Sequence, residues 1–190
     1  MDDKGVYIGT NNFTPGFSGT SLLVIPKTDL FGAVPNTANM TTFSTLSSGP
    51  DNGFAIQAAL NWQGNPTNTV SVIADSRDTN NEVFYKVNGV NAAGATQTVS
   101  SIIAGTGYSI AGEGRQPDGT RLVDTLSPRI SANAVQYNGM LFSTATVRST
   151  LGEFSAVRWT VVDANTGVLL SSGLIQQADY DFYQGSIDIN

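Results

Sequence analysis

The feature that most constrains the fold is a repeated grouping of short apolar runs separated by turn-forming residues. The clearest group has runs at 130–136, 140–147, 156–162 and 168–175. The Asn138-Gly139 pair between the first two runs is typical of a tight hairpin turn, because both positions require positive φ. This group predicts a four-stranded antiparallel meander.

Two other parts of the chain repeat this layout. The second group has runs at 54–62, 69–74, 82–87 and 96–102, and the first has runs at 6–9, 21–26 and 41–46. The first group is one strand short, and the strand-like segment 185–190 at the other end of the chain is expected to supply its inner strand. No segment combines a helix cap with a sustained 3.6-residue period, so little helix is expected.

Repeated four-stranded meanders favour an all-β fold built from β-propeller blades. We predict a single domain over 1–190, with about three blades at 5–47 plus 185–190, 53–103 and 129–176. Closed propellers have roughly 4 to 8 blades, so three cannot close a ring, and a homodimer would give a ring of six. A β-sandwich is the alternative, since many short strands with frequent turns fit it as well.

Composition limits the chemistry and the partners. The chain has 190 residues, 40% hydrophobic and 13% charged, with a net charge of −6 and neither cysteine nor histidine. Disulfides, thiolate nucleophiles, His-based catalysis and imidazole metal ligands are therefore excluded. The acidic balance makes nucleic acid and anionic membranes poor partners. No apolar stretch approaches the ~20 residues of a membrane span.

The same composition favours a secreted protein. Scarce lysine together with abundant Asn, Thr and Gly is typical of secreted bacterial β-proteins. The N-terminus lacks the basic-then-apolar layout of a secretory signal, so such a signal is expected to lie outside this chain.

Several motifs resemble blade segments of large secreted bacterial β-propeller-like proteins of poorly defined function. They are an Arg158-Trp159 strand, a Thr166-Gly167 turn and the segment 179–190, with further likeness at 6–13 and in 116–124. The resemblance covers most of the chain and implies a partial propeller, because such proteins have more blades. Gln184 stands where proline is usual in that family.

A propeller places candidate site residues on its inner strands, around a central channel. Asp188, Asn133 and Gln57 are the predicted metal ligands, because oxygen side chains facing a channel suit a hard cation such as Ca²⁺. The catalytic candidates are Asp188, Asp124 and Arg129. An inter-blade ion pair is an equally good interpretation of Asp124 and Arg129.

Loops and strand ends near the channel supply candidate ligand-binding residues. These are Asn11, Asn12, Asp75, Arg77, Trp62 and Arg148. A structural role is the simpler interpretation of several: asparagine is favoured in turns, and Asp75 and Arg77 fit a solvated loop.

Two functions of different classes follow. The first is a non-enzymatic extracellular module that binds glycans or surface polymers, with Trp62, Tyr85, Tyr180 and Tyr183 as stacking platforms. The second is a Ca²⁺-dependent hydrolase of lactones, aryl esters or phosphotriesters, in which the cation polarises the bond and a carboxylate acts as base or nucleophile. A glycosidase with paired carboxylates is a weaker third possibility.

Overall fold

The computed structural model describes residues 1–44, 46, 53–76, 78–119, 122–130 and 132–189. In this part of the chain there are fourteen strands and one helical turn, α1 (Lys27–Leu30). Almost all strand pairs are antiparallel. The prediction of an all-β fold is confirmed. Among the described residues, no helix has the length and apolar character needed to cross a membrane.

The first sheet comprises β1 (Gly5–Phe13), β2 (Phe17–Pro26) and β3 (Thr41–Phe43), in that order. The second comprises β4 (Phe54–Ala58), β6 (Thr69–Ser76), β7 (Asn81–Asn88) and β8 (Thr96–Ile103). Each sheet follows the chain order of its strands, as a meander does. The strands lie close to the predicted runs.

The third sheet has the order β14-β13-β12-β11-β5. Its strands are β11 (Val135–Tyr137), β12 (Met140–Arg148), β13 (Ser155–Asp163), β14 (Leu169–Ile175) and the short β5 (Leu60–Asn61). The pairing of β5 with β11 is parallel and brings Leu60 beside Val135. The strand β5, which directly follows β4 of the second sheet, therefore pairs with the edge of the third sheet.

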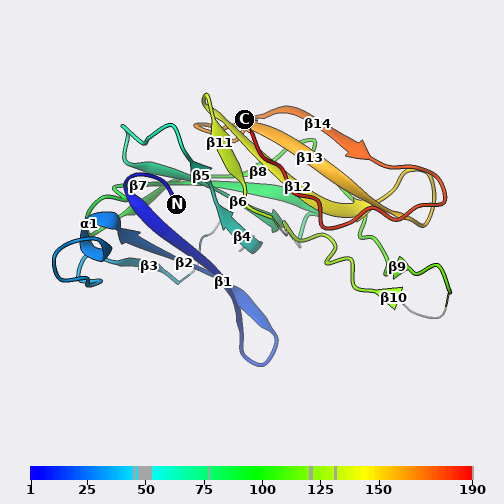
Figure 1. Ribbon diagram of the computed structural model, residues 1–190, viewed down its shortest axis with the longest axis horizontal. Coiled ribbons are helices and arrows are strands. Elements are labelled where there is room, and N and C mark those ends of the chain that lie inside the picture. Colours follow the sequence, from blue (N-terminus) through cyan, green and yellow to red (C-terminus); the bar gives the residue numbers. More distant parts are fainter. Residues whose placement is uncertain (45, 47–52, 77, 120–121, 131, 190) are drawn as a thin grey trace.

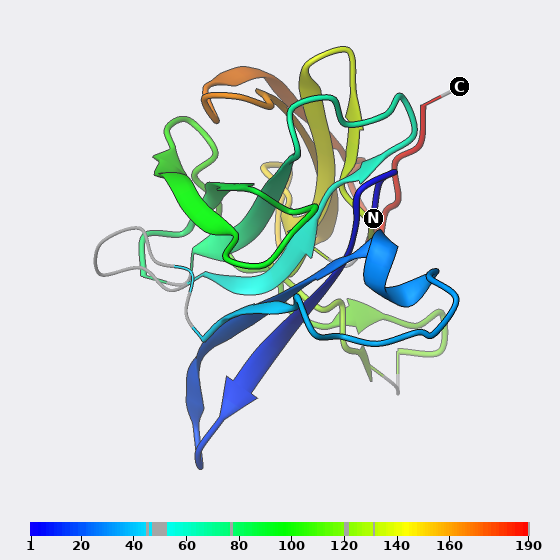
Figure 2. The same ribbon diagram turned by 90° about the vertical axis from the view of Figure 1, so that its left-hand side faces the viewer.

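The three sheets stack face to face, with the second in the middle (Figures 1 and 2). Alternate residues of the middle sheet point to opposite neighbours. Val72 and Tyr85 pack toward the first sheet, whereas Ile73 and Phe84 pack toward the third. Seven of the eight residues of β6 are buried, as expected for a strand covered on both faces. This three-layer stack differs from the two-layer sandwich considered as the alternative.

Turn chemistry at the β11–β12 hairpin agrees with the sequence. Asn138 and Gly139 have φ of 48° and 74°, the left-handed values that a two-residue hairpin of this type requires. The predicted hairpin turn is confirmed.

A buried ion pair joins the middle and third sheets. Arg158 Nη2 of β13 lies 2.8 Å from Glu82 Oε1 of β7, and their side chains are 6% and 1% exposed. Arg158 also donates to the Thr106 carbonyl oxygen and lies over the Tyr108 ring. Tyr108 in turn donates to Asp75, and burial, followed by this bond, raises the pKa of its hydroxyl. The network fills the end of the interface between these two sheets.

The C-terminal segment differs from its prediction. Residues 185–189 form no strand and add none to the first sheet, which consists of β1, β2 and β3. Instead, Thr144 Oγ1 of β12 donates to the Gly185 carbonyl oxygen, and Gln184 N donates to Thr146 Oγ1. A Cβ built on Gly185 would lie 2.5 Å from Val157 Cγ1 of β13. Side chains on the outer face of the third sheet thus hold this segment.

Candidate functional site

Three adjoining cavities lie at one end of the third sheet, beside the part of the chain between β8 and β11. Their volumes are about 710, 300 and 440 Å³. Arg148 lines the first two and Arg115 lines the second and third, so the cavities follow one another in a row. We call this row the arginine groove. The remaining lining residues are Gly107, Tyr108, Ser109, Ser149, Thr150, Leu174, Gly112, Glu113, Glu153, Gln116, Pro117, Asp179, Tyr180, Asp181 and Tyr183.

Arg115 stands at the centre of the groove, in the two-stranded sheet of β9 (Gly114–Arg115) and β10 (Leu122–Val123). Its guanidinium carbon lies 3.7 Å from the centroid of the Phe154 ring, and its Nε lies 3.1 Å from Asp181 Oδ2. Stacking on an aromatic face and a charge-assisted hydrogen bond together fix the plane of the guanidinium. The two Nη groups make no hydrogen bond with the described residues, so they are available to a ligand.

Asp181 holds this end of the groove together. Its Oδ2 accepts from the Arg115 backbone amide, and its Oδ1 accepts from the Ser155 backbone amide at 2.7 Å. Burial opposes ionisation of this carboxyl, but the hydrogen bonds from Ser155 and Arg115 outweigh it and hold the pKa of Asp181 below its ordinary value. Asp181 therefore connects β9, β13 and the C-terminal segment.

This lowered pKa predicts a pH-dependent stability difference between the wild-type protein and Asp181→Asn. A carboxyl with a lowered folded-state pKa stabilises the fold above its unfolded value of about 3.9, and that contribution is lost as the pH falls through the folded-state value. We expect wild type to exceed the variant in free energy of unfolding at neutral pH. The difference should shrink below about pH 4. Urea unfolding across this range measures it.

Asp179→Asn is the matched control, because Asp179 lines the same cavity without a hydrogen bond to the described residues. Its difference from wild type should stay small at each pH. If the loss of unfolding free energy in Asp181→Asn stayed the same or grew below about pH 4, it would contradict a lowered pKa of Asp181.

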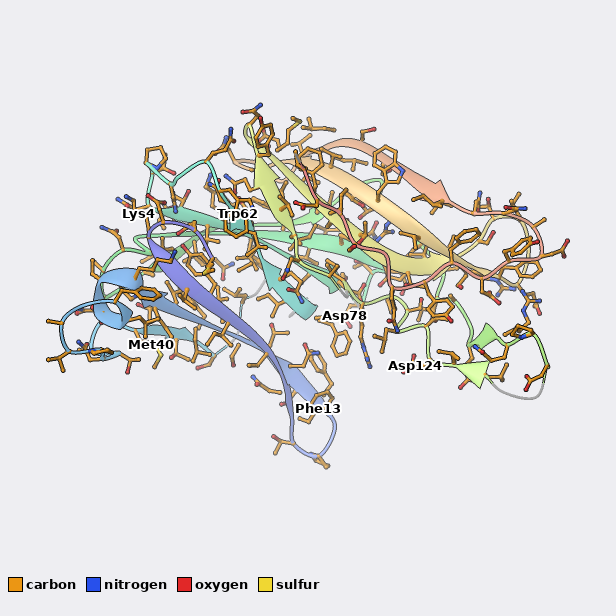
Figure 3. The ribbon with its side chains drawn as sticks, in the orientation of Figure 1. Lys4, Phe13, Met40, Trp62, Asp78 and Asp124 are labelled. Atoms are coloured by element: carbon orange, nitrogen blue, oxygen red, sulfur yellow. The ribbon has the colours of Figure 1, made fainter. Side chains whose placement is uncertain are left out.

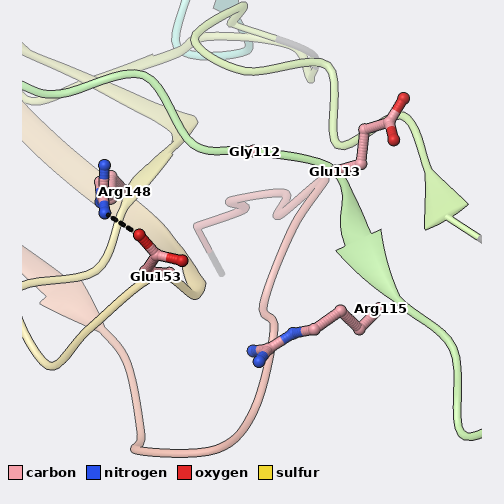
Figure 4. Close-up of a pocket in the computed structure, with 5 residues that line it drawn as sticks. All are labelled: Gly112, Glu113, Arg115, Arg148 and Glu153. Carbon is pink, nitrogen blue, oxygen red and sulfur yellow. Dashed lines mark hydrogen bonds and ion pairs between the residues drawn. The ribbon is translucent and has the colours of Figure 1, made fainter. Parts of the chain in front are cut away.

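Arg148 and Glu153 form the middle of the groove. Arg148 Nη2 lies 3.1 Å from Glu153 Oε1, and Glu153 is 90% exposed at its side chain, so this pair is open to solvent. Figure 4 shows both arginines extending toward the same space from different elements, while Glu113 turns its carboxylate away from Glu153. The two glutamates do not face each other as paired catalytic carboxylates would.

Two tyrosines line the far end. Tyr180 is 58% exposed, and Tyr183 packs against Gly114, where an added Cβ would lie 3.0 Å from its ring. Both come from the C-terminal segment that Asp181 fixes. Exposed aromatic faces beside hydrogen-bonding groups suit ligands with both apolar and polar surfaces.

The structure places the sequence-predicted binding residues in different parts of the molecule. Among the described ones, Arg148 and the predicted stacking residues Tyr180 and Tyr183 line the arginine groove. Asn11 accepts from the Ala55 backbone amide and Asn12 donates to Ser21, so both serve local structure. Asp75 is buried beneath Tyr108, and Arg77 lies outside the described residues.

Trp62 is 68% exposed and lines a separate cavity of about 200 Å³ near the N-terminus, with Met1 and Lys27 among its neighbours. Figure 3 shows it on a different part of the molecule from Asp124. Tyr85 has no exposed surface and lies in the core between the first and second sheets. The expectation that Tyr85 is a stacking platform is therefore wrong, because its position on β7 points inward.

The predicted catalytic and metal residues have local partners. Asp124 accepts from the Leu126 backbone amide, and the Arg129 guanidinium lies 5.4 Å from the centroid of the Phe54 ring. Gln57 donates to the Ile130 carbonyl oxygen. Asn133 and Asp188 are exposed. No hydrogen bond among the described residues joins Gln57, Asn133 and Asp188, and the Ca²⁺-dependent hydrolase stays a prediction from the sequence.

Sequence reasoning did not identify Arg115, Asp181 or Phe154 as site residues. Arg115 belongs to the turn-rich stretch 111–120, and Asp181 belongs to a run of Asp and Tyr residues near the C-terminus. Their separation of 66 positions hides the contact. The one available signal was the clustering of Tyr180, Asp181 and Tyr183 in a segment without strand pattern.

Comparison with protein-family models, with curated proteins and with solved structures finds no match to this chain.

Proposed function

We propose that this protein is a non-enzymatic extracellular module that binds glycans in the arginine groove. The observation that supports this most is the placement of Arg115, which stacks on Phe154, pairs with Asp181 and lines two of the cavities. Sugars offer hydroxyls to such donors and apolar ring faces to tyrosines such as Tyr180. Fixing the donor beforehand lowers the entropy lost on binding.

A glycan array probed with the purified chain tests the proposal, followed by calorimetric titration of the sugars that bind. Arg115→Gln is expected to weaken binding at least about tenfold, since hydrogen bonds from charged groups contribute about 1.5–3 kcal/mol. Tyr180→Ala is expected to weaken it by up to about tenfold, since an aromatic contact contributes about 0.5–1.5 kcal/mol beyond the area that it buries. Tyr137→Ala and Arg129→Gln are the matched controls, because both residues lie outside the groove. Equal losses in the control variants, or an array without any binding, would refute the proposal.

We further propose that the three stacked sheets are propeller blades and that two copies close a six-bladed ring. Each outermost sheet exposes apolar side chains, such as Ile8 of β1 at 45% and Ile175 of β14 at 53%. Light scattering after gel filtration is expected to give twice the mass of one chain. A monomer at micromolar concentration would contradict this arrangement.

A further inference from the structure

We infer that the ligand of the arginine groove is a chain of several uncharged sugar units, not an acidic glycan. This inference rests on the proposed function and specifies its substrate class. It follows from the charges that line the groove and from the way its cavities are connected.

The described lining of the groove offers no unpaired cation to an anionic sugar. Two guanidinium groups line it, from Arg115 and Arg148. Each already lies 3.1 Å from a carboxylate, Asp181 for the first and Glu153 for the second.

Two further carboxylates, those of Glu113 and Asp179, line the same cavities without an ion-pair partner among the described residues. Among the described residues, the lining therefore carries four acidic groups against two basic ones. A sugar carboxylate or sulfate would meet net negative charge, and placing like charges together costs affinity.

The same groups suit neutral sugars. Carboxylates accept hydrogen bonds from hydroxyls, and the free guanidinium N–H groups donate to hydroxyl oxygens. A hydroxyl can do both, so a run of hydroxyls can pair with donors such as Arg115 and with acceptors such as Asp179. Tyr180 adds an exposed aromatic surface at one end.

The length of the ligand follows from the connected cavities. Each has at least about the lower volume of a small-molecule site, which is roughly 300 Å³. Arg148 is shared by the first and second cavities and Arg115 by the second and third, so a ligand longer than the middle cavity can pass either arginine and enter a neighbouring cavity. A single sugar ring would use only part of this row.

The test is a calorimetric comparison of two ladders, each from dimer to hexamer, at neutral pH and low salt. One ladder holds neutral β-linked gluco-, manno- and xylo-oligosaccharides, and the other holds oligogalacturonates, measured both with EDTA and with added Ca²⁺. We expect affinity for at least one neutral series to rise with chain length. We expect the matching oligogalacturonates to bind at least about tenfold more weakly.

A double variant, Glu113→Gln with Asp179→Asn, removes the unpaired carboxylates and is expected to reduce this discrimination. Asp124→Asn serves as the charge control, because Asp124 is exposed and does not line the groove. Its ratio of neutral to acidic affinity should equal that of wild type.

The results distinguish failure of the neutral, extended ligand from failure of glycan binding itself. Oligogalacturonates that bind as tightly as neutral chains, under either cation condition, would overturn this inference and leave glycan binding standing. Dimers that bind as tightly as hexamers would overturn the extended ligand. A glycan array without any binding would refute the proposed function itself.

Discussion

Replacing Arg158 by methionine is expected to lower the free energy of unfolding by about 3–5 kcal/mol, because it leaves the buried Glu82 carboxylate without its partner. Both side chains are almost fully buried, at 6% and 1% exposure, and they join β13 to β7. The change also removes the donor to the Thr106 carbonyl oxygen and the cation above Tyr108. Urea unfolding at neutral pH measures the loss.

A double replacement separates the charge from the packing. Arg158→Met combined with Glu82→Leu removes both charges together, and replacing a buried ion pair by apolar residues is often neutral or stabilising. We expect the double variant to recover much of the stability that the single variant loses. A single variant within about 1 kcal/mol of wild type would contradict this cost of leaving Glu82 without its partner.

Gly167→Ala is the second large effect, with an expected loss of about 2–5 kcal/mol. Gly167 lies in the β13–β14 turn with φ of 73°, where an L-residue costs roughly 1–2 kcal/mol. A Cβ at this position would lie 2.5 Å from Phe84 Cδ1 and 2.8 Å from Phe84 Cβ. Because Phe84 is fully buried in the core between the second and third sheets, overpacking adds about 1–3 kcal/mol.

The chain offers a close control at another turn. Gly139 has φ of 74°, and an added Cβ there would meet no atom within 4 Å. Gly139→Ala therefore carries the backbone cost alone, and the difference between the two variants measures the close approach of the β13–β14 turn to the middle sheet. Equal losses, determined by thermal and urea unfolding, would mean that Phe84 moves aside at no cost.

Local sequence signals predicted most of the strands. The Asn138-Gly139 turn and the strand predicted at 140–147 depend on neighbours in the chain, and both agree with the structure. These features need no knowledge of distant contacts.

Contacts between distant segments were not predictable in this way. The β5–β11 pairing joins Leu60 to Val135 through two residues of strand, too short a run to leave a pattern. The segment 185–189 reads as a strand, yet Thr144 and Thr146 of β12 hold its start in irregular form.

The candidate site also depends on contacts between distant segments of the chain. Its central residue, Arg115, is oriented by Phe154 and Asp181, and these partners come from the β12–β13 connection and the C-terminal segment. Composition predicted the absence of histidine and cysteine chemistry, but the meeting of these three residues depends on tertiary packing.

The parallel pairing of β5 with β11 has a consequence for fragments of this protein. Leu60 precedes the strands β6 to β8 and Val135 follows them, so this contact closes a large loop of the chain. A protease that cuts between β8 and β11, in the stretch that holds β9 and β10, would leave two pieces held together by this contact and by the shared core. That stretch is thus the natural place to split the polypeptide into two complementing halves.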